Sequence, residues 1–229
     1  MTLQFLDLSP AAWGLLTFSA ILIGLSKTAI PGINTLSIAI FAAFLPPKES
    51  TAAILLLLIV GDVFALISYR RHARWRTLIR LIPAVTIGLA AGALFLAFAN
   101  DSWVRRAIGV ILLLLVAFNA WQQFRKSRRP SMISSQSGDD ETDSGSGTRT
   151  ARWGYGSLGG FTTMVANAGG PPMSLYFLSV GFPVKAFLGT AAWFFAVINL
   201  VKVPIMAGLG LFVPEVLTLA LLMVPGVIV

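Results

Sequence analysis

The chain has 229 residues, of which 56% are hydrophobic and only 11% are charged, and its formal net charge is +8 at pH 7. Soluble domains usually carry about 25% charged residues, so this composition excludes an ordinary soluble domain. There is no cysteine, which excludes disulfides and thiolate metal sites. The basic residues lie in short runs beside apolar segments, which indicates membrane topology rather than nucleic-acid binding.

Residues 1–124 are predicted to form a first transmembrane repeat of five apolar segments. About 20 apolar residues are needed to cross a bilayer, and the second segment is short for a span. It follows Pro31-Gly32 directly, so we expect the first two segments to form a broken or partly re-entrant pair. The five segments are Ala11–Ile30, Ile33–Leu45, Ala52–Tyr69, Leu78–Phe98 and Val104–Phe124.

Residues 125–151 separate this part from the rest of the chain. They hold a basic cluster followed by Ser/Gly-rich sequence with several acids. Such a composition cannot bury apolar area, so we expect a disordered linker, and its basic cluster predicts a cytoplasmic location. Residues 152–229 are predicted to form a second transmembrane repeat with the last segment incomplete. Its segments are Trp153–Ala168, Pro172–Val180, Ala186–Leu211 and Val216–Val229.

The two halves resemble each other when the first is shifted by 137 positions. An odd number of spans per repeat would invert the second half, as is common in secondary transporters. Residues 81–85 also resemble residues 223–227, but a further span follows only the first, so we expect a C-terminally shortened sequence. The shift pairs Gly32 with Gly169, Ser37 with Ser174, Pro46 with Pro183, Lys48 with Lys185 and Asp62 with Asn199.

The sequence therefore predicts an all-α fold. We expect a polytopic transmembrane helical bundle of two homologous, inverted halves with broken helices. The loop from Arg70 to Arg80 holds five arginines and no acid, which places it on the cytoplasmic side.

Three charged residues are expected inside the membrane, namely Lys27, Asp62 and Lys202. Each costs at least about 2.5 kcal/mol at a helix centre, so each needs a reason to be there. One interpretation is a structural ion pair between Asp62 and Lys202. The other is that one or both line a substrate path. Lys27 lies nearer a helix end and could either line that path or extend its ammonium group to the interface.

Two interruptions in the apolar segments combine hydroxyl groups, an Asn and a Pro/Gly break. A broken helix exposes unpaired backbone N–H groups, and its N-terminal end favours anions. Two such breaks facing each other, with Lys27 and Lys202 nearby, would form an anion site at the repeat interface. Alternatively, the hydroxyl groups of residues 26, 28, 162 and 163 only bond helix carbonyls. The break residues are Pro31, Gly32, Gly169, Gly170 and Pro171.

No pattern favours an enzyme. The single histidine, His72, lies in the basic loop, and no second histidine exists to form a metal pair. Gly159-Gly160 and Gly169-Gly170 lack the spacing and the lysine of a phosphate-binding loop. We therefore expect no catalytic residue, no metal and no cofactor.

With these motifs in view, the sequence resembles the sulfite exporter TauE/SafE family, also called the toluenesulfonate uptake permease family. The resemblance covers nearly the whole chain except the linker. It rests on Gly-Leu-Ser-Lys-Thr at 24–28 with Pro31-Gly32, Val-Gly-Asp-Val-Phe-Ala at 60–65, Tyr-Arg-Arg-His at 69–72 with Trp75, Gly-Phe-Thr-Thr-Met-Val-Ala-Asn at 160–167 with Gly170-Pro171, Gly189-Thr190, Trp-Phe-Phe at 193–195, and Asn199 through Lys202 and Pro204.

This resemblance implies a multi-pass transporter in the plasma (inner) membrane with two homologous halves. Members of the family are associated with moving sulfite, sulfoacetate and other organosulfonates, generally outward. The expected partners are a small anionic substrate and the lipid bilayer, with no nucleic acid, and a homodimer is compatible with the sequence.

The mechanism that we favour is alternating access of the two halves around an anion site. Lys27 and Lys202 would supply positive charge, because an anion enters a low-dielectric site only when it is paired and hydrogen-bonded. Asp62 would carry a coupling proton. An anion-selective channel and a structural membrane subunit are the alternatives. The side chains expected to orient the oxygens of the anion are Thr163, Asn167 and Asn199.

Overall fold

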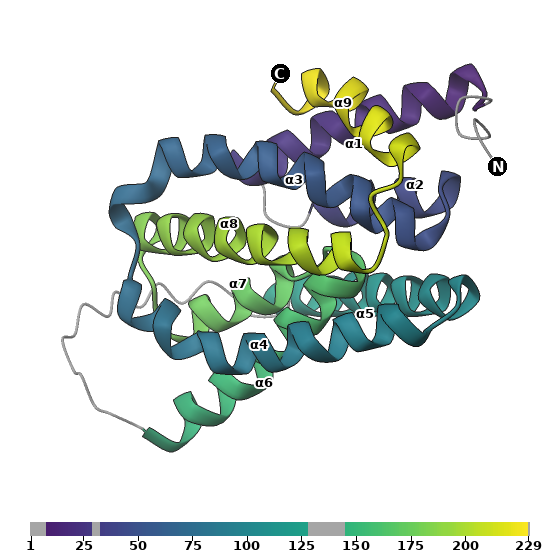
Figure 1. Cartoon of the computed structure of the whole chain (residues 1–229). Helices are drawn as coiled ribbons and strands as arrows, with labels where there is room; N and C mark the ends of the chain where they lie inside the picture. The colour runs from purple at the N-terminus through teal and green to yellow at the C-terminus, as the bar shows by residue number, and fades with distance from the viewer. Residues whose placement is uncertain (1–7, 29–32, 128–144, 229) are drawn as a thin grey trace.

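The computed structural model describes residues 8–28, 33–127 and 145–228, and this part of the chain is almost entirely helical, without a strand (Figure 1). The predicted all-α fold is confirmed. The predicted break residues Pro31 and Gly32 lie outside the described residues. The helices are α1 (Pro10–Thr28), α2 (Asn34–Phe44), α3 (Pro47–Tyr69), the short 3-10 helix η1 (Arg70–His72), α4 (Trp75–Phe98), α5 (Asp101–Ser127), α6 (Gly145–Ala166), α7 (Gly170–Ser179), α8 (Val184–Gly208) and α9 (Pro214–Ile228).

Proline and glycine mark several of the helix ends. Pro47 and Pro214 begin α3 and α9. At the first position of a helix the backbone N–H makes no intrahelical hydrogen bond, so proline, which lacks this group, is tolerated there. Gly181 and Gly210 follow the ends of α7 and α8 with φ angles of 72° and 70°, the left-handed conformation that commonly closes a helix. These residue choices explain why the predicted segments and the observed helices end close together.

The described part of the chain is built to lie in a membrane. Four helical stretches are long and apolar enough to span one, namely Pro10–Lys27, Pro47–His72, Trp75–Phe98 and Val184–Gly208. Large apolar side chains cover their outer surfaces, and Phe98 at the end of α4 is 86% exposed. A soluble protein would place charged side chains on such surfaces, so the chain is a multi-pass membrane protein.

The helices repeat in the order that the 137-residue shift predicts. The shift places α1 on α6, α2 on α7, α3 on α8 and α4 on α9. The packing repeats as well. In α1, Gly24 lies against the backbone of Val227 in α9, and in α6, Gly160 lies against the backbone of Val85 in α4. Each half therefore packs its first helix closely against the fourth helix of the other half.

The equivalent helices α3 and α8 run antiparallel beside each other (Figure 1). At one end, Gly189 near the start of α8 faces the backbone of Tyr69 at the end of α3. In the middle, Asn199 of α8 donates a hydrogen bond to Asp62 of α3. Two equivalent helices that run in opposite directions are the relation expected for inverted repeats. Asp62 and Asn199, 137 positions apart, meet where the two halves join.

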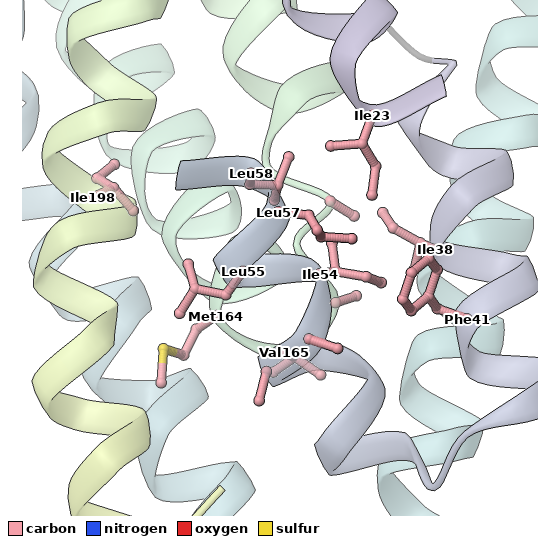
Figure 2. Close-up of a cluster of buried hydrophobic side chains, with 14 of the residues drawn as sticks. Ile23, Ile38, Phe41, Ile54, Leu55, Leu57, Leu58, Met164, Val165 and Ile198 are labelled. Carbon is pink, nitrogen blue, oxygen red and sulfur yellow. The ribbon is translucent and has the colours of Figure 1, made fainter. Parts of the chain in front are cut away.

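Helix α3 is the central element of the core. Figure 2 shows apolar side chains of α3 between those of α1 and α2 on one side and those of α6 and α8 on the other. Close packing at native density leaves little room for these helices to shift independently. The labelled side chains are Ile23, Ile38, Phe41, Ile54, Leu55, Leu57, Leu58, Met164, Val165 and Ile198.

Helical structure reaches into both ends of the predicted linker at 125–151. Helix α5 continues to Ser127 and α6 begins at Gly145. The linker sequence between them, residues 128–144, lies outside the described residues, and its predicted disorder stays a prediction.

Candidate functional site

A cavity of about 100 Å³ lies where the two halves meet. A volume of this order holds several water molecules or one small anion. Its walls come from the end of α1, the start of α2, the middle of α3, the end of α6, the start of α7 and the first half of α8. The polar residues in the lining are Ser26, Lys27, Asn34, Asp62, Thr163, Asn167, Ser174 and Asn199, and the others are Leu58, Ala65, Gly170, Phe187, Leu188, Ala191, Ala192 and Phe195.

An ion pair crosses the cavity wall between α1 and α3. The Nζ atom of Lys27 lies 2.6 Å from Oδ1 of Asp62, and the two side chains are only 12% and 4% exposed. The second carboxylate oxygen, Oδ2, accepts a hydrogen bond of 2.7 Å from Nδ2 of Asn199. Both oxygens of Asp62 are thus bonded, as a buried carboxylate requires. The ammonium group of Lys27 also lies 5.0 Å from the ring centroid of Phe195.

The ion pair that we considered between Asp62 and Lys202 does not form. Instead, Nζ of Lys202 donates one hydrogen bond of 2.7 Å to the backbone oxygen of Thr163 and another to Oδ1 of Asn167. The reason is the position of Lys202 beside the carboxyl end of α6. Backbone oxygens there carry the negative end of the helix dipole, and the Thr163 oxygen accepts the Lys202 ammonium in addition to the backbone N–H of Asn167 at 3.0 Å.

Lys202 is fully buried and does not line the cavity. It lies behind Thr163 and Asn167, which do. We predicted Lys27, Lys202, Thr163, Asn167, Asn199 and Asp62 as site residues. Five of these residues line the cavity, while Lys202 lies behind it and bonds the backbone oxygen of Thr163 and the side chain of Asn167.

Asn167 is held at both ends of its amide. Its Oδ1 accepts the hydrogen bond from Lys202, and its Nδ2 donates one of 2.8 Å to the backbone oxygen of Thr51. Its φ of 54° is the one positive value of a non-glycine residue in the described ranges, and Asn is one of the few residue types that adopt it. Asn167 therefore joins α3, α6 and α8. Its amide nitrogen carries two N–H groups and the bond to Thr51 uses one of them, so the predicted donation from Asn167 to an anion stays a prediction.

The N-terminal ends of α2 and α7, which follow the two predicted breaks, face the same cavity. Asn34 begins α2 and Gly170 begins α7, and both line it. The side chain of Asn34 donates a hydrogen bond of 3.3 Å to the backbone oxygen of Asn167, which ties one break to the other. Gly169 packs against the side chain of Thr163, and Pro171 lies in the first turn of α7. Two helix N-termini at one cavity favour a negative ligand.

Sequence reasoning did not assign a role at the site to Thr51 or Ser174, whereas Asn34 is the Asn that it noted in the first break. Ser174 is the repeat equivalent of Ser37, but the hydroxyl of Ser37 bonds the Ser19 backbone oxygen and Ser37 is not among the lining residues, so the repeat gives no signal for Ser174. Thr51 offers only its backbone oxygen to Asn167, and side-chain chemistry gives no signal for such a role. Of the hydroxyl groups considered, that of Ser26 bonds the Ile23 oxygen at 2.7 Å, as the simpler interpretation predicted.

The cavity extends toward one end of the bundle. On α8 its lining runs from Phe187, near the start of the helix, to Asn199 in the middle. On α3 it runs from Leu58 to Ala65, toward the carboxyl end. These two helix ends meet at the basic corner that begins at Arg70, whose backbone oxygen accepts a hydrogen bond from α8. Toward the other end, the Thr51–Asn167 contact and the apolar cluster of Figure 2 fill the space.

Comparison with known proteins identifies the family to which this chain belongs. No curated protein and no solved structure matches the chain. The family model described as sulfite exporter TauE/SafE matches residues 16–229. That range includes both halves and every residue around the cavity. The chain belongs to the sulfite exporter TauE/SafE family, a family of membrane transporters.

Proposed function

We propose that this protein is a secondary transporter that exports a small sulfur-containing anion, such as sulfite, sulfoacetate or another organosulfonate, by alternating access. The observation that carries the proposal is the cavity at the junction of the two inverted halves, with the part-buried Lys27 in its wall and the fully buried Lys202 behind it. Secondary transporters with inverted repeats bind their substrates in this place, at broken helices. Membership of the TauE/SafE family supplies the substrate class.

The electrostatics of the cavity suit an anion. Lys27 and Asp62 neutralise each other, whereas Lys202 is bonded only to neutral oxygens. The N-terminal ends of α2 and α7 add partial positive charge at the cavity wall. An anion that leaves water needs such compensation, because an unpaired charge in a low-dielectric interior is very costly.

The shape of the cavity supports loading from the cytoplasm. The basic corner between α3 and α4 is proposed to face the cytoplasmic side of the plasma membrane, together with the linker at 125–151. The cavity reaches from Asn199 toward that corner and is closed toward the other end by the contact between Thr51 and Asn167. This arrangement is an inward-facing state, and the exposed arginines would raise the local concentration of anions at its entrance.

Asp62 is the group that we propose for proton coupling. It is the one carboxyl group lining the cavity in the described part of the chain. When ionised, it holds the ammonium group of Lys27 at 2.6 Å. A proton on Asp62 would weaken that ion pair and release Lys27 to an incoming anion. Proton and anion binding would then support each other, which is the requirement for symport of a proton with the anion.

The test is uptake of radiolabelled sulfite and sulfoacetate into proteoliposomes, with and without an imposed pH gradient. Wild type is compared with Lys202→Ala and Asp62→Asn, and Lys185→Gln serves as the matched control because Lys185 is exposed on the first turn of the same helix. Saturable, gradient-sensitive flux that the Lys202→Ala and Asp62→Asn variants lose and the control retains supports the proposal. Conductive flux without saturation would support an anion channel. A folded wild type without any flux would refute transport of these anions.

A further inference from the structure

The buried charges around the cavity do not balance. Lys27 and Asp62 form an ion pair with an N–O distance of 2.6 Å, and together they contribute no net charge. Lys202 has no exposed surface, and its ammonium group donates hydrogen bonds to the Thr163 oxygen and the Asn167 amide oxygen, both neutral. With all three groups ionised, the cluster carries one excess positive charge.

No other carboxylate in the described ranges compensates this charge. The remaining described acids are Glu49, Asp101 and Glu215, each in the first turn of a helix. Asp101 and Glu215 act electrostatically on Glu49, so the three lie at one end of the bundle. Glu49 precedes Asp62 by 13 residues on α3, which is about 20 Å along the helix axis.

We infer that the cavity selects anions by valence and takes a monoanion in preference to a dianion. A monoanion brings the cluster of Lys27, Asp62 and Lys202 to zero net charge. With a dianion bound, the cavity and its ligand would carry one excess negative charge. An uncompensated negative charge in the interior is as unfavourable as the uncompensated positive charge of the empty cavity. The inference rests on the proposed function, because it concerns the same cavity. It narrows the substrate class to singly charged sulfur oxyanions, such as hydrogen sulfite, and disfavours sulfoacetate, which carries two negative charges at neutral pH.

Because of its position, Lys202 affects anion binding through its charge and not through contact with the anion. It is separated from the cavity by Thr163 and Asn167, so it does not touch a bound ligand and cannot recognise the arrangement of oxygens. Its field nevertheless acts strongly at short range in a low-dielectric surrounding. Lys27 and Asp62 are both close enough to Lys202 to act on it electrostatically. The valence preference should therefore follow the total charge of the cluster and not one particular contact.

Methanesulfonate and sulfate are the matched probes, since both are small and tetrahedral and differ by one charge. Their binding is measured by isothermal titration calorimetry on the full chain in lipid nanodiscs. Wild type is expected to bind methanesulfonate at least about tenfold more tightly than sulfate. Asp62→Asn raises the cluster charge to two and is expected to reverse the preference. Adding Lys27→Gln to Asp62→Asn returns the charge to one and should restore the preference for methanesulfonate.

Lys202→Met is an independent test. It lowers the net charge of the cluster from one to zero, so it should weaken the binding of both probes by at least about tenfold. It decides the question even if Asp62→Asn cannot be purified as a monodisperse protein. Equal binding of the two probes by wild type, or an unchanged preference in Asp62→Asn, would overturn the inference. If sulfite flux is present while valence has no effect, only this inference fails. If neither binding nor flux is found, the proposed function fails with it.

Discussion

Replacing Asn167 tests the network that closes one end of the cavity. In Asn167→Ala the donor to the Thr51 oxygen is lost, a neutral hydrogen bond worth about 1 kcal/mol, and so is the amide acceptor of the Lys202 ammonium, worth about 2 kcal/mol. Alanine must also adopt the φ of 54° that Asn167 has, which costs it about 1 kcal/mol or more. The free energy of unfolding should therefore fall by about 4 kcal/mol.

Thermal unfolding of the detergent-purified protein measures this change, and for a chain of this length the loss corresponds to a fall in Tm of roughly 10 °C. Asn167→Gly is the matched control. It loses the same hydrogen bonds but accepts the left-handed conformation, so it should be about 1 kcal/mol more stable than Asn167→Ala. Equal Tm values for the two variants would refute the backbone argument. A Tm unchanged from wild type in both would refute the hydrogen-bond network.

Two further predictions concern helix packing and the ion pair. A Cβ atom added at Gly160 would lie 2.3 Å from the backbone oxygen of Val85, so Gly160→Ala should lower the free energy of unfolding by about 1–3 kcal/mol. Gly109→Ala, where nothing lies within 4 Å, should raise it by up to about 1 kcal/mol; similar Tm shifts in the two variants would contradict the close helix approach. Lys27→Met should cost about 3 kcal/mol by leaving the Asp62 carboxylate without its cation, and adding Asp62→Asn should recover most of that loss. A double-mutant cycle in the same unfolding assay measures this coupling, and additive effects would show that the ion pair contributes nothing.

Much of the architecture follows from the sequence, because apolar run length is a local property. The segments predicted at Ala52–Tyr69 and Leu78–Phe98 correspond to α3 and α4, which differ from them only at their first residues. Proline and glycine mark the helix ends for steric reasons that need no tertiary contact. The 137-residue repeat likewise predicted which helices are equivalent and placed Asp62 and Asn199 at equivalent positions; that the two side chains are hydrogen-bonded to each other appears only in the structure.

The sequence alone also determined which residues could form the site, since charged and amide side chains within apolar helices are costly and few. Which of them pair was decided by tertiary structure. Lys27 and Lys202 are both candidate partners of Asp62, and only the packing of α1 against α3 brings Lys27 to 2.6 Å. The packing of α8 against α6 directs Lys202 to the Thr163 oxygen instead. Which partner a charged side chain takes depends on how the helices are rotated and on where backbone oxygens lie, and the type of the side chain alone predicts neither.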